Sequence, residues 1–262
     1  MTAADAGTPC IEIDGLGASP EQLRAAALDS YGHFTAMQVR NRRVRGLDLH
    51  MARLDSANRE LFGAGLAPAE VRALIRHALG DDIRDASVRV YVRELQDRAS
   101  VMVTVRPPGG MPSAPWRLQS VPYQRSLAHI KHLADFGQGY YQRLARRNGF
   151  DEALMTGPDA VISEGTITNI GFYDGSGIVW PAAPALQGIT MQLLDLTLPG
   201  AGLPARRAVV HVPDIGSFSA VFVTNARGVA PVGRIDDHCL PRDAGLMRTL
   251  TELYESAPWD RI

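Results

Sequence analysis

The sequence predicts an α/β (α+β) protein of two lobes: a small N-terminal lobe over residues 1–106 and a larger C-terminal lobe over 116–262. Residues 87–93 (SVRVYVR) alternate between apolar and polar side chains, which is typical of a half-buried strand. Apolar side chains recur at helical spacing over residues 47–61. Between the lobes, residues 107–115 (PPGGMPSAP) are rich in proline and glycine and predict an interdomain linker.

Each expected element of the small lobe has its own signal. A hairpin over 33–47 is expected to turn at Asn41-Arg42, where the alternation breaks, and Gly63 or Gly65 should end the helix that follows it. Pro68 begins a second helix, which stops at Gly80. Strands are expected at 10–13, 87–93 and 100–105.

The large lobe is expected to mix short strands with helices. The expected strands cover 151–155, 161–163, 168–173, 178–180, 219–224 and 229–235. The expected helices cover 137–148, a segment after Gly188, and 241–254. No internal repeat or low-complexity tract is present.

Composition excludes several classes of function. The formal net charge is −1, which predicts neither nucleic acid nor an anionic membrane as a partner. No apolar run reaches the length of a membrane span. Two cysteines, Cys10 and Cys239, make no disulfide framework, and the first residues lack a signal-peptide pattern, so we expect a cytoplasmic protein. The arginines of residues 40–45 are interpreted as a solvated hairpin tip.

Lysine is almost absent from the chain. Of 27 basic residues, 26 are arginines, and Lys131 is the single lysine. Arginine can replace lysine in ion pairs but cannot form a Schiff base, which needs an amine that loses its proton. Composition leaves two interpretations open for Lys131: covalent chemistry, or a surface lysine that has no special role.

Other motifs fail. Residues 15–20 (GLGASP) lack the third glycine of a dinucleotide-binding turn, and no phosphate loop of the GK[ST] type is present. His129, His132 and Asp135 have a spacing that a helix could use to bind a metal, but no second cluster completes such a site. We therefore expect no metal.

An ordered set of motifs surrounds Lys131. After the lysine come GFDEAL at 149–154, SEGTITNI at 163–170 and GIT at 188–190. The segment RGLDLHMARLDSANREL precedes it and FVTNARGVAPVGRID follows. The set resembles the class IV aminotransferases, the fold-type IV enzymes that depend on pyridoxal 5′-phosphate (PLP) and include branched-chain and D-amino-acid aminotransferases and aminodeoxychorismate lyase. The resemblance covers nearly all of residues 31–237 and implies two lobes with the cofactor between them.

The resemblance implies a role for each matching residue. Lys131 would hold PLP as an internal aldimine and then move the substrate Cα proton. Glu164 would face the pyridine nitrogen and sustain the electron sink. The remaining cofactor-binding residues would hold the phosphate: Arg53 as the cation, Ile189 and Thr190 at a helix N-terminus, and Thr224 and Asn225 at a strand end. Without the resemblance, Glu164 would be read as a surface residue at a turn and Arg53 as an exposed helix arginine.

Substrate residues are expected from position in the small lobe. The candidates are His33, Gln38 and Arg93, of which Arg93 could bind a carboxylate through two hydrogen bonds. The sequence departs from the branched-chain pattern at Phe136, where those enzymes carry a tyrosine, and from many relatives at Gln38, where they carry a basic residue. These departures suggest a divergent branch with its own substrate.

The resulting prediction is a PLP-dependent aminotransferase that moves an amino group between an amino acid or amine and a keto acid. Two alternatives stay open: an eliminase similar to aminodeoxychorismate lyase, and a PLP-binding homologue that has lost turnover. The resemblance also implies a homodimer.

Overall fold

The computed structural model describes residues 10–95 and 98–262, which form two compact units. The first unit holds the described residues up to Gly109 together with residues 130–134 and 258–262, and the second holds the other described residues. The main boundary lies within the segment expected as a linker. The expectation that all of 116–262 forms the second lobe does not hold, because Lys131 belongs to the first unit.

An antiparallel sheet forms the first unit, with the strand order β2-β1-β6-β5-β3. Its strands are β1 (Cys10–Ile13), β2 (Leu16–Gly17), β3 (His33–Val39), β5 (Ala86–Leu95) and β6 (Arg98–Arg106). Buried and less buried residues alternate along β3 and β5, so one face of this sheet packs on the core and the other is more open.

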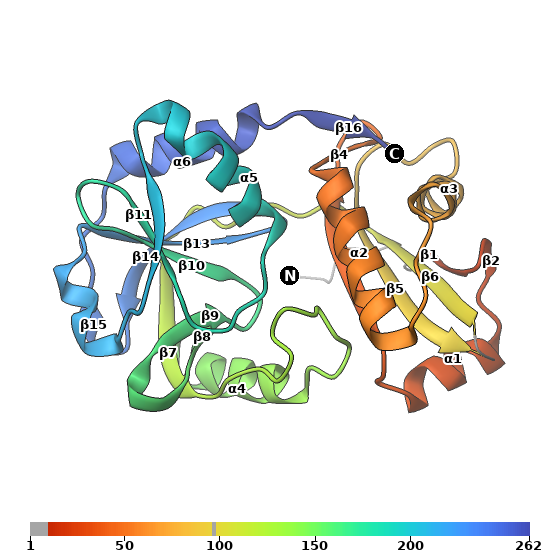
Figure 1. Cartoon of the computed structure of the whole chain (residues 1–262), viewed down its shortest axis with the longest axis horizontal. Helices are drawn as coiled ribbons and strands as arrows, with labels where there is room; N and C mark the ends of the chain where they lie inside the picture. Colours follow the sequence, from red (N-terminus) through yellow and green to blue (C-terminus); the bar gives the residue numbers. More distant parts are fainter. Residues whose placement is uncertain (1–9, 96–97) are drawn as a thin grey trace, which may run out of the picture. The chain divides into compact units, whose positions relative to one another are not determined.

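Helices α2 (Leu47–Phe62) and α3 (Pro68–Leu79) pack on the core face of this sheet (Figure 1). Helix α2 ends at Gly63, whose φ of 72° is the left-handed conformation that suits glycine at this position. Helix α1 (Pro20–Leu28) was not expected, although Ser19 and Gln22 form a capping box at its start. It buries no residue, so the sequence has no apolar stripe there to reveal it.

Only the turn of the hairpin expected at 33–47 is confirmed, because β3 pairs with β5 and not with the strand that follows the turn. Asn41 and Arg42 have φ values of 48° and 59°, and the main chains of Arg40 and Arg43 hydrogen-bond across the turn. Strand β4 (Arg43–Arg45) does not continue the main sheet but pairs with β16 (Trp259–Arg261). The Asp260 carboxylate then accepts a hydrogen bond from the Leu47 amide, which caps the start of α2.

The second unit is built on a mixed sheet, with β7 (Trp116–Pro122) and β8 (Glu152–Thr156) parallel near one end. The order is β12-β11-β10-β13-β14-β7-β8-β9, and β15 (His238–Cys239) pairs with β14 (Gly228–Ile235). The remaining strands are β9 (Ile162–Gly165), β10 (Asn169–Tyr173), β11 (Ile178–Pro181), β12 (Ala205–Ala208) and β13 (Ala220–Asn225). Because β9 also contacts β10 and β11, the sheet curls back on itself.

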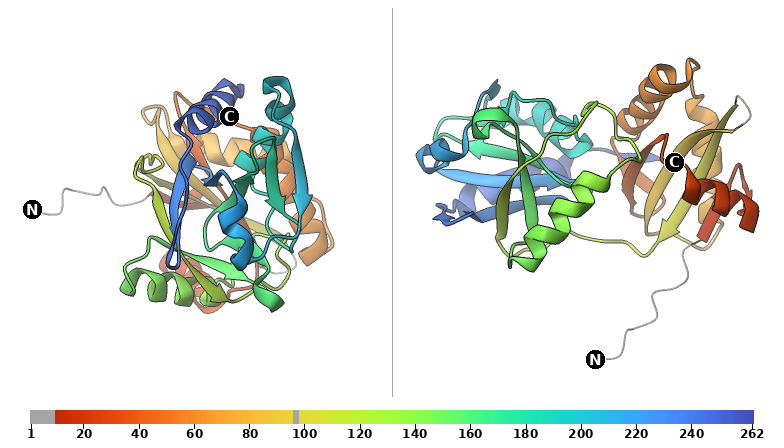
Figure 2. Two further views of the ribbon diagram at one scale, coloured as in Figure 1. Left: turned by 90° about the vertical axis from the view of Figure 1, so that its left-hand side faces the viewer. Right: turned by 90° about the horizontal axis from the view of Figure 1, so that it is seen from below.

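Three α-helices cover this sheet. Helices α5 (Ile189–Thr197) and α6 (Ala244–Ser256) contact each other and pack on β13 and β14 (Figure 1). Helix α4 (Phe136–Arg147) packs on β7 and β8, as Figure 2 shows from below. No helix among the described residues is long and apolar enough to cross a membrane.

Gly171 should be a sensitive packing position in the second unit. A Cβ there would lie 2.4 Å from Phe222 Cζ and 2.8 Å from Trp180 Cζ3, two rings that already contact each other edge to face. We expect Gly171→Ala to lower the free energy of unfolding by about 1–3 kcal/mol through overpacking, measured by urea unfolding with tryptophan fluorescence. Gly200→Ala is the control because its Cβ would meet no atom within 4 Å. Equal effects of the two substitutions would refute this account.

Candidate functional site

The main chain of residues 131–133 lies along the edge of the first unit's sheet. The Phe34 amide donates to the Lys131 carbonyl at 2.8 Å, and the Leu133 amide donates to the Gly32 carbonyl at 2.9 Å. This pairing places the Lys131 ammonium 4.7 Å from the centre of the Phe34 ring. A cation over an aromatic face is stabilised electrostatically, so the ring helps to hold the lysine against β3.

Behind this edge, Arg53 of α2 binds two polar side chains. Its Nη2 donates to the Thr35 hydroxyl and lies near His50 Nδ1, and the Thr35 hydroxyl contacts the same His50 nitrogen at 2.7 Å. All three residues are on the core side of the sheet. Arg53 Nε is buried without a hydrogen-bond partner, and leaving such a group unpaired costs about 1–3 kcal/mol.

Burial sets the charges of this cluster. It lowers the pKa of His50 well below its ordinary value, and the charges of Arg53 and Lys131 lower it further. His50 is therefore neutral, and its Nδ1 can accept a hydrogen bond from the Thr35 hydroxyl. Burial also lowers the pKa of Arg53 to about 10, which leaves Arg53 charged near neutral pH. The cluster thus holds a permanent cation whose buried Nε–H group is unused.

The structure separates the three predicted substrate residues. His33 is on the core face of β3, where it is 1% exposed and its Nε2 lies 3.4 Å from Asn58 Oδ1. Its pKa is about 4, mainly because it is buried. Gln38 and Arg93 lie on the opposite, more open face, because side chains alternate along a strand. Gln38 Oε1 accepts from the Gly109 amide, so it anchors the start of the linker.

In the second unit, Glu164 forms a buried ion pair. Arg125 Nη1 lies 3.0 Å from Glu164 Oε1 and also donates to the Ala128 carbonyl, while the Leu186 amide donates to Glu164 Oε2. The two charged side chains are 3% and 7% exposed. Residues 163–165 were expected to have turn character, but Glu164 lies in β9, opposite Met155 of β8. The carboxylate is therefore fixed in position rather than free in solvent.

The turn that follows Glu164 is built around a second buried carboxylate, Glu152. It accepts hydrogen bonds from the Ile167 amide at 2.6 Å and from the hydroxyls of Thr168 and Thr166 at 2.9 and 3.2 Å. Gly165 makes this approach possible, since a Cβ there would lie 2.6 Å from Glu152 Oε1. Glu152 of the GFDEAL motif therefore holds the turn inside the SEGTITNI motif in place by direct hydrogen bonds.

Two segments of the predicted phosphate site meet in the second unit. Thr190, in the first turn of α5, donates from its hydroxyl to the Asn225 carbonyl at 2.6 Å. Gly188 precedes this helix and makes no side-chain cap, so the first amides of α5 have no capping side chain. A Cβ at Gly188 would lie 2.0 Å from Asn169 Oδ1, so only glycine fits there.

Thr224 is the better of the two donor candidates at the end of β13. It pairs with Asn169 in register, so both side chains lie on one face of the sheet. Its hydroxyl is buried and has no partner. The Asn225 side chain is already used, because its Oδ1 accepts from the Arg227 amide. The predicted residues Ile189, Thr190, Thr224 and Asn225 are therefore neighbours, with unused donors among them.

Sequence reasoning missed the residues that hold the predicted ones. Arg125 is one of 26 arginines, and nothing in its neighbours marks it as a partner of Glu164. His50 lies in the motif RGLDLHMARLDSANREL, in which only Arg53 was assigned a role, and Thr35 lies in a strand without any motif of its own. Within residues 10–95 and 98–262, no three His, Cys, Asp or Glu side chains gather to suit a metal ion.

The chain is similar to a known family over most of its length. The family model "Amino-transferase class IV" matches residues 32–235. No match was found among curated proteins.

Solved structures share the fold at low sequence identity. A branched-chain aminotransferase from Thermoproteus uzoniensis, with norvaline, has a TM-score of 0.82 at 19% identity over 94% of this chain and 93% of that one. A hypothetical aminotransferase from Mycobacterium tuberculosis, in a PLP-bound form, has a TM-score of 0.78 at 19% identity over 88% of this chain and 90% of that one. A putative 4-amino-4-deoxychorismate lyase from Legionella pneumophila has a TM-score of 0.80 at 19% identity over 87% of this chain and 92% of that one. The predicted fold type IV is thereby confirmed.

Glu152 should make stability depend on pH. Burial raises its pKa to about 7 against the hydrogen bonds that lower it. Because the pKa is higher in the folded chain, protonation of Glu152 stabilises the folded state. This stabilisation is complete below the pKa of the unfolded chain, near 4.5, and is lost as pH rises through 7. Between pH 5 and 8, we expect the free energy of unfolding of wild type to fall by up to about 3 kcal/mol more than that of Glu152→Gln. Urea unfolding at each pH measures both. Exposed Glu252→Gln should follow wild type; parallel profiles for wild type and Glu152→Gln would contradict the assignment.

Proposed function

Because the chain belongs to the class IV aminotransferases, a PLP-dependent family, we propose that it is a transaminase that moves an amino group from an amino acid or amine to a keto acid. The observation that carries the proposal is Lys131. It is the only lysine of the chain, and main-chain hydrogen bonds hold it at the edge of β3.

The polar groups of the first unit suit the amine and phosphate ends of PLP. Lys131 supplies a primary amine for covalent attachment. Arg53 supplies a cation whose buried Nε lacks a partner, which a phosphate oxygen would satisfy. This arrangement supports the roles that the family resemblance implies for both residues.

The second unit, taken by itself, carries groups that suit the ring nitrogen and the phosphate of PLP. The amides at the start of α5 and the unpartnered Thr224 hydroxyl are donors for phosphate oxygens. The Glu164 carboxylate, held by Arg125 and the Leu186 amide, is an acceptor for a protonated ring nitrogen. We assign Ile189, Thr190 and Thr224 to the phosphate and Glu164 to the ring; the part of Asn225 is its main-chain carbonyl, which positions Thr190.

The chemistry divides between the cofactor and the chain. Bound PLP would supply an electron sink for the electrons of the broken Cα–H bond. The Lys131 amine would act as the general base that accepts the proton from the substrate Cα and as the acid that later gives it back. Glu164 would hold the proton on the ring nitrogen, and Arg125 would keep the carboxylate oriented. Gln38 and Arg93, on the open face of the sheet, remain the candidates for substrate contact.

A lyase is the second candidate, because the chain shares its fold with a putative 4-amino-4-deoxychorismate lyase. Such an eliminase would release pyruvate and need no keto-acid acceptor. The proposal of a homodimer in the cytoplasm rests on the family resemblance and on the cysteine content.

Borohydride trapping tests Lys131. We expect purified protein with PLP to show an absorbance band of bound cofactor that borohydride fixes, with the added mass on the peptide that contains Lys131. Because no other side-chain amine exists in the chain, the only competing primary amine is the N-terminal one. Lys131→Ala should lose both the band and the adduct.

The same sample separates the alternatives. Transfer of amino nitrogen to 2-oxoglutarate supports the transaminase, whereas pyruvate release without an acceptor supports the lyase. A trapped cofactor that responds to no amine would identify a homologue without turnover. Failure to trap PLP on Lys131 in wild type would overturn the proposal.

Thr224→Val separates cofactor binding from stability. Valine has the same shape but removes a buried hydroxyl that has no partner, so without PLP the free energy of unfolding should stay equal or rise by up to about 1 kcal/mol. With PLP, the dissociation constant should rise about five- to tenfold. Thr156→Val is the matched control, since its buried hydroxyl donates to the Val121 carbonyl; it should destabilise the chain and leave the PLP dissociation constant unchanged. Unchanged PLP affinity in Thr224→Val would remove Thr224 from the site.

A further inference from the structure

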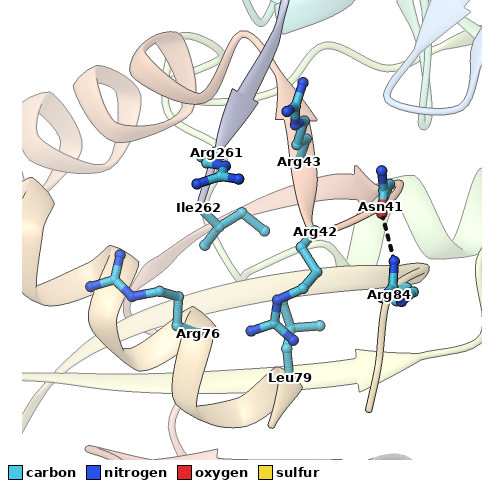
Figure 3. A pocket seen from close by; sticks show the side chains of 8 residues that line it. All are labelled: Asn41, Arg42, Arg43, Arg76, Leu79, Arg84, Arg261 and Ile262. Atoms are coloured by element: carbon cyan, nitrogen blue, oxygen red, sulfur yellow. Dashed lines mark hydrogen bonds between the residues drawn. The ribbon is translucent and has the colours of Figure 1, made fainter. Parts of the chain in front are cut away.

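The first unit contains a cavity of about 370 Å³ at the turn that joins β3 to β4. Figure 3 shows that its side chains come from the hairpin turn, helix α3, the turn after α3 and the segment of β16. Five of the lining residues are arginines: Arg42, Arg43, Arg76, Arg84 and Arg261. The volume falls within the range of small-molecule sites.

The positive charge of this cavity is not balanced by ion pairs. None of the five arginines forms an ion pair with a carboxylate of the described residues. Asp81, Asp82 and Asp85 belong to the adjoining turn but do not line the cavity, and the Asp85 carboxylate accepts from the Asn41 amide. A carboxylate at Ile262 would offset only one of five positive charges. In a chain of net charge −1, such a concentration of cations is a local feature.

Two of the guanidinium groups are held in place. Arg42 Nη1 donates to the Gly80 carbonyl at 2.6 Å, and Arg84 Nη1 donates to Asn41 Oδ1, drawn as the dashed line in Figure 3. Arg261 and Arg43 are register partners of β16 and β4, so their side chains leave the same face. A cation that is already fixed loses less conformational entropy when it binds an anion.

The cavity also has an apolar part. Leu79 is 1% exposed, and Ile262 packs against the hydrophobic core of this unit. In Figure 3, Arg42, Arg76 and Arg261 lie around Ile262. An occupant can therefore place anionic groups against the arginines and a less polar portion against these two side chains.

We propose that this cavity binds a small polyanion, a molecule with two or more phosphate or carboxylate groups. Arginine forms paired hydrogen bonds with both groups, and several arginines from separate elements favour more than one negative charge. The cavity is distinct from the surroundings of Lys131. Along β3, the Arg42 turn lies about eight residues from Phe34, which is roughly 25 Å of extended chain. The proposal does not depend on the transaminase activity.

Calorimetric titration tests the proposal. Full-length protein saturated with PLP is titrated with inorganic pyrophosphate and, separately, with citrate at constant ionic strength, with acetate as the monovalent control. We expect saturable binding of at least one polyanion and none of acetate. Binding of pyrophosphate alone assigns a phosphate ligand, and binding of both assigns a general polyanion site.

A matched pair of double variants locates the site. Arg76→Gln/Arg261→Gln removes two lining cations whose guanidinium groups make no hydrogen bond within the described chain. It should raise the dissociation constant of the polyanion at least about tenfold. Arg24→Gln/Arg106→Gln removes the same charge from exposed positions of this unit outside the cavity and should change it less than about twofold. No saturable binding at millimolar polyanion, or an equal loss in both pairs, would overturn the proposal.

Discussion

The antiparallel bridge between His33 and His132 is the interaction on which the first unit's chemistry depends. It brings a segment from far along the chain to the edge of β3 and sets the position of Lys131 by main-chain hydrogen bonds. Gly32 permits the approach, since its φ is 155° and a Cβ there would lie 3.0 Å from Leu133 Cδ1 of the approaching segment. Only after this pairing does the lysine lie over Phe34, with Arg53, Thr35 and His50 behind the same strand.

The second unit relies on buried charges in a different way. Glu164 and Glu152 are both enclosed, but Glu164 meets a guanidinium, whereas Glu152 meets an amide and two hydroxyls. A paired carboxylate keeps its charge when water is excluded, and an unpaired one tends to take up a proton. One short stretch of chain therefore holds a carboxylate suited to ring contact and another suited to supporting a turn.

The sequence predicted best what leaves a periodic or ordered trace. The hairpin turn at Asn41-Arg42, helices α2 and α3, and the motifs at Lys131, Glu164 and Thr190 could all be located from residue patterns. Helix α1 has no buried face, and the alternation along β7 breaks at the adjacent polar residues Gln119 and Ser120, so neither element was expected. Arg125 could not be found, because an ion-pair partner that comes from a loop has no spacing rule. His33 was assigned to the substrate only from its position in the chain. Alternation along β3 places its side chain on the core face, whereas Gln38 is on the other face of the sheet.

The first unit is also discontinuous in sequence, and this has a consequence for synthesis on the ribosome. Its sheet receives residues 130–134 at one edge, and β4 finds its partner only in β16, near the end of the printed sequence. The Asp260 cap on α2 comes from the same late segment. All residues of the second unit have been synthesised when residue 257 is added, before the first unit receives residues 258–262. Because domains tend to fold as their chains emerge, the second unit can fold first. The unit that is synthesised first is then the last to be completed.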